Sequence, residues 1–221
     1  MKLLALDTST DACSAAVWLD SEVAERFLLA PRGHADHILA MIESLLAEAG
    51  LKLRDLDALA FGRGPGAFTG VRIATGVVQG LAFGAGLPVV PVSSLAALAQ
   101  AAPADRVLAA IDARMDEVYW GMYRRDAGGI VRLVGDERVC PHRQVPVPEE
   151  TGWTGVGSGW DRYSTALLAR LGQTVAGWKP ECYPHAADVA VLGADGYRQG
   201  LAVAPELALP VYLRDEVVQK R

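Results

Sequence analysis

The first residues that could do chemistry stand directly after the apolar run 3–6, in the order Asp7-Thr8-Ser9-Thr10. Hydroxyls and backbone N–H groups in such a turn suit a phosphate, and a carboxylate suits a metal ion or a water. The same residue types also form ordinary turns at strand ends, where Asp, Ser and Thr side chains bond to nearby backbone groups. The four residues alone leave both interpretations open.

The loop 62–70 is a second candidate phosphate site. It holds four glycines and a proline, follows an apolar strand and precedes an expected helix at 71–83. Strand, glycine loop and helix in this order let backbone N–H groups meet an anion at a helix N-terminus. Arg63 and Arg72 could supply charge, but the loop lacks the lysine of the common phosphate-loop motif. The alternative is a tight turn that only positions the helix.

Other groupings of chemical side chains predict no metal site. His34 and His37 are three residues apart, whereas zinc ligands on a helix are usually four apart with another ligand elsewhere. Cys13, Cys140 and Cys182 are odd in number and distant, so neither a metal spacing nor a disulfide framework follows. No Ser-His-Asp or Cys-His arrangement is legible, and we predict no catalytic residue.

Composition narrows the class of protein. The 221 residues carry a net charge of −5 with a pI near 5.4, which argues against a protein that wraps nucleic acid by bulk charge. Hydrophobic residues make up 51%, and residues 73–104 carry no charge. Glycines and prolines break that stretch, so we expect buried structure rather than a membrane span. The run 3–6 is too short for a signal sequence, and we expect a cytoplasmic protein.

Apolar patterning indicates the elements that must position these residues. Each half opens with an apolar strand that ends in an aspartate, Asp7 or Asp112, followed by a turn and a second strand. Helices are expected at 34–49, 71–83, 95–101, 162–171 and 186–199. Because Pro103 marks a boundary, we expect a first lobe at 1–104 and a second at 105–221, with a tail that could return to the first lobe.

The first lobe also offers a face for a partner. The apolar residues of the helix at 34–49 recur at helical spacing, as Ile38, Met41, Ile42, Leu45 and Leu46. Small residues of the next helix recur every four positions, at Gly76, Gly80 and Gly84. Such a smooth stripe permits close packing, either within the chain or against another subunit, and both remain open.

Several sequence blocks together resemble the bacterial TsaB family, also called YeaZ, over residues 1–214. The blocks are LALDTST at 4–10, GRGPGAFTGVRI at 62–73, GLA at 80–82, VSSL at 92–95, DARMDEVY at 112–119 and PVYLR at 210–214. The glycine block and the Asp-Ala-Arg block are specific to that family.

The resemblance implies an α/β fold with two lobes, the actin-like ATPase (ASKHA) fold, in which duplicated mixed sheets are flanked by helices. It implies an accessory subunit of the machinery that makes N6-threonylcarbamoyladenosine (t6A) in tRNA. Its partners would be a TsaD-type transferase and a TsaE-type ATPase, and it would form a homodimer when alone. It would meet tRNA only through the complex. Older glycoprotease-like naming derives from TsaD relatives.

The same resemblance implies a non-catalytic chain. The transferase relative carries a His-x-x-x-His metal pair, which this sequence lacks. Asp112 is followed by Ala-Arg-Met-Asp, where active actin-like ATPases carry glycines that admit a phosphate. The runner-up function is a small actin-like ATPase or kinase that uses Asp7, Thr8 and the loop 62–70.

Two sets of candidate residues follow. A vestigial or shared nucleotide site, which would take ATP or ADP at the boundary with a partner subunit, is assigned to Asp7, Thr8, Ser9, Arg63, Gly64 and Gly66. The partner interface is assigned to Ile38, Met41, Leu45, Leu46, Gly76 and Gly80. No cofactor of the chain's own is expected.

Overall fold

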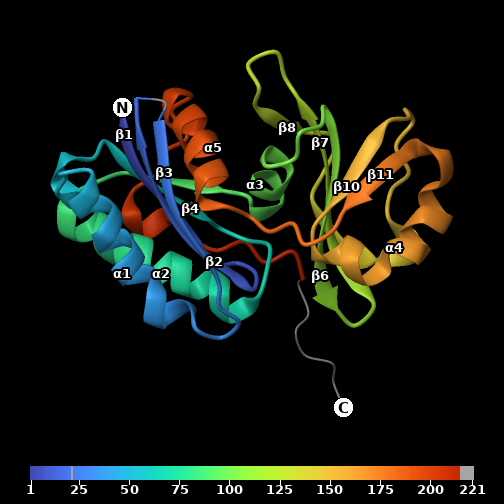
Figure 1. The fold of residues 1–221 in the computed structure, drawn as a ribbon, viewed down its shortest axis with the longest axis horizontal. Helices are drawn as coiled ribbons and strands as arrows, with labels where there is room; N and C mark the ends of the chain where they lie inside the picture. Colours follow the sequence, from blue (N-terminus) through green and yellow to red (C-terminus); the bar gives the residue numbers. More distant parts are fainter. Residues whose placement is uncertain (21, 215–221) are drawn as a thin grey trace.

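The computed structural model describes residues 1–20 and 22–214, and within these ranges the strands form two sheets that lie side by side (Figure 1). The first sheet has the order β3-β2-β1-β4-β5. Its strands are β1 (Lys2–Asp7), β2 (Ala12–Leu19), β3 (Glu22–Leu29), β4 (Ala58–Gly62) and β5 (Val89–Val92). β1 pairs antiparallel with β2 and parallel with β4, so the sheet is mixed.

The second sheet repeats this plan. Its order is β11-β10-β6-β7-β8, and β9 also pairs with β7. Its strands are β6 (Arg106–Arg114), β7 (Glu117–Arg125), β8 (Val131–Leu133), β9 (Arg138–Pro141), β10 (Trp153–Val156) and β11 (Val175–Lys179). β6 pairs antiparallel with β7 and parallel with β10, as β1 does with β2 and β4. The expected duplication of mixed sheets flanked by helices is confirmed.

Helices cover both faces of the first sheet. The α-helices are α1 (His34–Glu48), α2 (Phe68–Ala85), α3 (Ser94–Gln100), α4 (Ser158–Leu171) and α5 (Ala186–Arg198). Alternating side chains of β1 divide between the two faces, as the period of a strand requires. In Figure 1, α1 and α2 lie on one side of the first sheet and α5 lies on the other. Leu4 and Leu6 pack in the cluster with α1 and α2, whereas Leu3 and Ala5 pack in the cluster with α5. α2 lies beside α1 in one helical layer.

The expected helices are present, with shifted ends. α1 and α5 agree with the expected ranges within one residue, and Ser93 caps α3 by accepting hydrogen bonds from two backbone N–H groups. α2 begins at Phe68 and α4 at Ser158, each about one turn earlier than apolar spacing suggested. β9 and β11 were not expected, because each is short and mostly half-exposed.

Packing crosses the sequence boundary at 104/105 in both directions. α3, from the first half, packs against β6 and β7 of the second sheet. α5, from the second half, packs against the first sheet, and Gly193 allows its close approach because a Cβ there would lie 2.6 Å from the Ala60 Cβ. The tail after α5 also contacts the first sheet, where Val203 forms an antiparallel bridge with Val89 of β5. The tail therefore lies on the first lobe.

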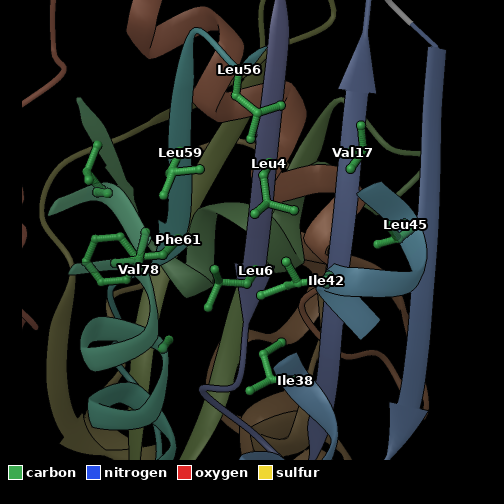
Figure 2. Packing of buried hydrophobic residues seen from close by; sticks show 14 of the residues in the cluster. Leu4, Leu6, Val17, Ile38, Ile42, Leu45, Leu56, Leu59, Phe61 and Val78 are labelled. Carbon is green, nitrogen blue, oxygen red and sulfur yellow. The ribbon is translucent and has the colours of Figure 1, made fainter. Parts of the chain in front are cut away.

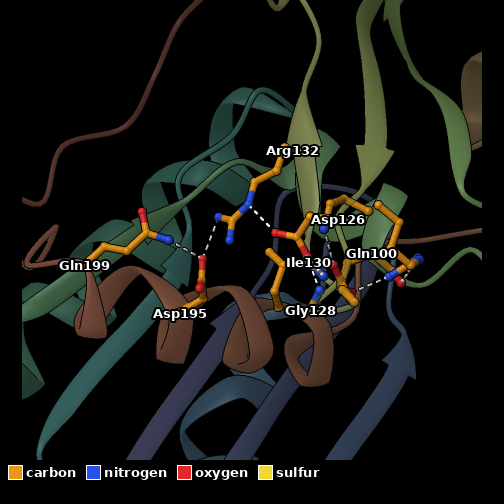
Figure 3. A network of polar contacts seen from close by, with 10 residues as sticks. Gln100, Asp126, Gly128, Ile130, Arg132, Asp195 and Gln199 are labelled. Atoms are coloured by element: carbon orange, nitrogen blue, oxygen red, sulfur yellow. Dashed lines mark hydrogen bonds and ion pairs between the residues drawn. The ribbon is translucent and has the colours of Figure 1, made fainter.

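A polar network joins α5 to the β8 hairpin of the second sheet (Figure 3). Arg132 on β8 donates to Asp126 at 2.9 Å and to Asp195 on α5 at 2.6 Å. Gln199 also donates to Asp195, at 2.7 Å. The Arg132 guanidinium thus links the second sheet to α5, a helix that packs on the first sheet although it comes from the second half of the sequence. No helix in the described ranges has the length and apolar character needed to span a bilayer.

Candidate functional site

A cleft of about 730 Å³ lies between elements of the two lobes. The first lobe supplies the turn after β1 and the start of α2, the second supplies the β6–β7 turn and the start of α4, and the tail lines one side. Its lining residues are Ser9, Thr10, Asp11, Gly66, Ala67, Phe68, Val71, Ile111, Asp112, Ala113, Arg114, Tyr119, Ser158, Asp161, Arg162, Tyr183, Val211, Tyr212 and Arg214.

Asp7 faces the interior and not the cleft. It is fully buried, and its Oδ1 accepts hydrogen bonds from the Ser9 backbone N–H and hydroxyl, both at 2.8 Å. Its Oδ2 accepts from the Ser94 hydroxyl at 3.1 Å. Burial raises the pKa of Asp7 to about 6, although these hydrogen bonds act in the opposite direction. The carboxylate is thus an internal acceptor that fastens the β1 turn to α3.

Thr8 is also fully buried, and its hydroxyl donates to the Gly70 carbonyl at 2.7 Å. Neither Asp7 nor Thr8 lines the cleft. Their assignment to a nucleotide site is therefore corrected, because both side chains are occupied inside the first lobe.

The glycine loop packs directly on the turn after β1. A Cβ on Gly62 would lie 1.7 Å from Asp7 Oδ2, one on Gly66 would lie 2.2 Å from the Ser9 carbonyl oxygen, and one on Gly70 would lie 2.0 Å from the Thr8 carbonyl oxygen. The backbone N–H of Ala67, at the start of α2, donates to the Ser9 carbonyl at 2.7 Å. Since protein groups already fill the space and take this donor, the loop is a close-packed turn that fixes α2.

The other residues assigned to the nucleotide site lie in different surroundings. Ser9 and Gly66 line the cleft, Ser9 with its side chain bonded to Asp7. Gly64 is buried with φ +91°, and its carbonyl accepts the Ser94 N–H at 3.0 Å. Arg63 is absent from the lining, and its buried Nε has no hydrogen-bond partner among the described residues. These residues do not form one phosphate-binding surface.

The second-lobe turn has a glycine-type backbone without glycine. Arg114, Met115 and Asp116 have φ of 63°, 55° and 60°, in the left-handed region. Asp112 at the turn's base accepts hydrogen bonds from the Arg114 backbone N–H and guanidinium, both at 3.0 Å, and from Tyr163 at 3.3 Å. The side chains expected to crowd this turn are therefore present in the conformation that glycine adopts most easily.

Sequence reasoning missed the cleft's aromatic and tail residues. The Arg72 guanidinium lies 3.4 Å from the Phe68 ring centroid and donates to the Tyr212 hydroxyl at 2.9 Å. Arg214 donates to the Ala113 carbonyl at 3.1 Å and also bonds the Glu117 carboxylate. The block PVYLR at 210–214 was the signal, but its contacts with loops about 100 residues earlier have no local pattern in the sequence.

The cleft does not fit a magnesium nucleotide of the kind that actin-like ATPases bind. The cleft is lined by three arginines, Arg114, Arg162 and Arg214, and by three aspartates, Asp11, Asp112 and Asp161, so its lining has no net positive charge. The glycine loop offers no open cradle, as described above. A polyphosphate would therefore find neither free backbone donors in that loop nor uncompensated positive charge.

The residues assigned to the partner interface fall into three classes, of which Figure 2 shows the buried one, Ile38 and Leu45. Ile38 and Leu45 point to the sheet, with exposures of 0% and 1%, so their assignment to the interface is corrected: they belong to the core. Met41 and Leu46 are half-buried beside that core. Gly76 and Gly80 are exposed, and a Cβ on either would meet nothing within 4 Å.

Two residues of this surface were not assigned from the sequence. Phe83 on α2 is 82% exposed and Leu39 on α1 is 50% exposed. Gly84 is likewise open to solvent. The outer face of α1 and α2 thus combines a bare glycine crest with prominent apolar side chains, which is typical of a surface that another protein covers.

Fold and site together define an actin-like protein of two lobes whose glycine loop is packed shut and whose first-lobe helices offer a bare apolar face. A model of the TsaD family, described as tRNA N6-adenosine threonylcarbamoyltransferase, matches residues 28–220. The tRNA threonylcarbamoyladenosine biosynthesis protein TsaB of Escherichia coli is 43% identical, over 100% of this chain and 98% of its own.

Solved structures agree. YeaZ from Pseudomonas aeruginosa superposes with a TM-score of 0.90 at 50% identity, over 96% of this chain and 99% of its own. A second Pseudomonas aeruginosa structure, described as an uncharacterized protein with similarity to peptidase YEAZ, gives 0.89 at 49% identity, with the same coverage. The chain belongs to the TsaB (YeaZ) family of tRNA threonylcarbamoyladenosine biosynthesis proteins, and the resemblance in the sequence is confirmed.

Proposed function

We propose that this chain is a non-catalytic accessory subunit in the synthesis of t6A in tRNA, and that it binds and supports a TsaD-type transferase subunit through the outer face of α1 and α2. The observation that carries the proposal is the contrast between the two surfaces. The glycine loop 62–70 is packed against the chain's own groups, whereas Gly76, Gly80 and Phe83 on the helix face are exposed.

The closed site supports a non-catalytic role. Asp7 is the acid that an actin-like kinase would use, and it is fully buried with its oxygens hydrogen-bonded. A catalytic acid or base must reach the proton that it transfers, and this carboxylate reaches only Ser9 and Ser94. In the described residues no cluster of three potential metal ligands occurs. The partner subunits would then carry out the threonylcarbamoyl transfer and any ATP hydrolysis.

The helix face supports a protein partner. α2 carries a single charged residue, Arg72, in 18 residues, and its crest is formed by glycines. A partner helix can approach such a crest closely, and Leu39 and Phe83 would serve as apolar anchors on either side. A second copy of the chain would use the same patch in a two-fold, isologous dimer.

Further components belong to the proposal. We place a TsaE-type ATPase in the same complex, a homodimer of the chain when it is alone, and contact with tRNA only through the assembly. The acidic net charge of −5 supports the last point. ATP or ADP would bind at the boundary with the partner rather than inside this chain's own loop. Because tRNA modification serves translation, we place the protein in the cytoplasm.

Reconstitution tests the proposal directly. Unmodified tRNA, a threonylcarbamoyl donor and the TsaD-type and TsaE-type subunits of the same organism are combined with and without this chain, and t6A is quantified by mass spectrometry of nucleosides. We expect t6A only when the transferase and this chain are both present. Formation of t6A by this chain without the transferase, or an unchanged yield when it is omitted, would contradict an accessory role.

Two further measurements address the alternative functions. Calorimetry with millimolar Mg-ATP should show no binding to the lone chain, and heat of binding with turnover would favour the ATPase or kinase. Incubation with denatured protein substrates should yield no cleavage, and cleavage would favour a peptidase.

A further inference from the structure

The C-terminal tail lies in the same layer as α1 and α2. Ile38 of α1, Val78 of α2 and Ala208 of the tail belong to one buried cluster over the first sheet. Gln79 on α2 donates from Nε2 to the Ala208 carbonyl at 3.1 Å, and Arg72 donates to the Tyr212 hydroxyl at 2.9 Å. The tail thus runs along α2 in the opposite direction to the helix and is fixed to it at both ends.

The fixed tail presents leucines to solvent. Ala208 is fully buried, and its neighbours Leu207 and Leu209 are 61% and 57% exposed. The short turn Pro205–Leu207 packs against α2, so these leucines stand beside the helix and not on a loose end. Holding two leucines in water on an ordered segment forgoes burial that a covering surface would provide.

The tail also supplies area that two helices alone lack. α2 is about 27 Å long and each helix is about 10 Å across, so the outer face of α1 and α2 presents on the order of 540 Å². A stable interface takes about 800 Å² from each partner. The tail adds a third strip on the order of 100 Å², because it is fixed to α2 at Arg72 and Gln79, which are about 10 Å apart along the helix.

We propose that the tail segment around Leu207 and Leu209 forms the third strip of the partner-binding face, beside the glycine crest of α2, and that the transferase subunit covers it. The proposal rests on the proposed function. Over the crest and the tail the occupant presents an apolar surface with little charge, because Glu206 is the only charged residue at 204–210 and Arg72 the only one on α2. The exposed carboxylates at 36, 43 and 48 lie on α1. The leucines of the tail and Phe83 of α2 would contact that surface beside the crest.

Paired variants test the strip. The double variant Leu207→Glu/Leu209→Glu places charge on the tail, and Gly76→Arg places a large side chain on the crest. The matched control is Leu133→Glu, at an exposed leucine of the second sheet. The dissociation constant for the TsaD-type subunit is measured by calorimetry, and melting temperatures show that each variant folds. We expect at least 10-fold weaker binding for the tail and crest variants and less than a twofold change for Leu133→Glu.

A milder pair, Leu207→Gln/Leu209→Gln, should weaken binding severalfold and keeps the test open if the charged pair unfolds. Unchanged binding in a folded tail variant, with binding lost in Gly76→Arg, would overturn the tail strip alone. Unchanged binding in both would also overturn the helix face of the proposed function. If the tail variant abolishes only self-association of the lone chain, measured by light scattering, the occupant is a second copy and the proposal fails.

Discussion

Replacing Asp7 with asparagine should stabilise the protein at neutral pH. Asp7 is fully buried, and burial raises its pKa from 3.8 to about 6. Asparagine keeps an acceptor for the Ser9 backbone N–H and hydroxyl, and its amide can donate to the Ser94 hydroxyl in place of the present bond. The variant therefore removes a buried charge, retains the two bonds from Ser9 and replaces the bond from Ser94.

The size of the effect follows from the pKa. Because the folded protein holds the proton of Asp7 more tightly than the unfolded chain, this group makes folding less favourable as pH rises from about 4 to about 6. A shift of about 2 pKa units at 1.36 kcal/mol each corresponds to about 3 kcal/mol. The free energy of unfolding of Asp7→Asn should exceed that of the wild type by nearly this amount above pH 7, and by little at pH 4.

Urea unfolding of both proteins between pH 4 and 7.5 measures that difference. Burial also raises the pKa of Asp188, to about 7, but this group is present in both proteins and cancels. Asp36→Asn, at an exposed carboxylate of α1, controls for net charge. A difference that stays flat across the pH range would refute the reasoning. Synthesis of t6A should be unchanged by Asp7→Asn, whereas an ATPase using this acid would lose activity.

Other changes have definite signs. Gly70→Ala should lower the free energy of unfolding by at least about 2 kcal/mol, because its Cβ would lie 2.0 Å from a carbonyl oxygen. Gly76→Ala, whose Cβ would meet nothing within 4 Å, should raise the free energy of unfolding by about 1 kcal/mol. Urea unfolding measures both changes. Met115→Gly should raise the melting temperature by a few degrees, since its φ is 55°. Glu25 raises the pKa of His185 by hydrogen bonding, so the pair stabilises below about pH 6.5, and this contribution fades as pH rises through the folded-state pKa. Glu25→Gln should lower that pKa in an NMR titration.

Periodicity sufficed for most of the scaffold. The spacing of Ile38, Ile42 and Leu45 predicted a helix, and the same spacing makes these side chains face the sheet. Assigning Ile38 and Leu45 to a partner surface overlooked this consequence, since one apolar stripe cannot serve both the core and a partner. The small residues that periodicity counts as neutral, Gly76 and Gly80, proved to be the outward ones.

The site was harder to predict, because the role of each residue depends on its neighbours in space, which the local sequence does not reveal. Asp7 and the loop 62–70 have the composition of a phosphate site, and only the distance between them shows that each fills the other's space. The burial that raises the pKa of Asp7 comes from segments far away in the sequence, such as the one that carries Ser94. Likewise, nothing near Arg214 in the sequence indicates its bond to Glu117.

The closed loop and the bare helix face are mechanically connected. Gly66 and Gly70 bring the start of α2 against the carbonyl groups that follow β1, and the Thr8 hydroxyl bonds to the Gly70 carbonyl. These contacts anchor α2 at its N-terminus, and Ala208 fixes its side. In a phosphate-binding protein, the N–H groups of such a loop remain free for the anion. Here the loop bonds to its own lobe, and these contacts hold α2 with its glycines exposed on the face that we propose for partner binding.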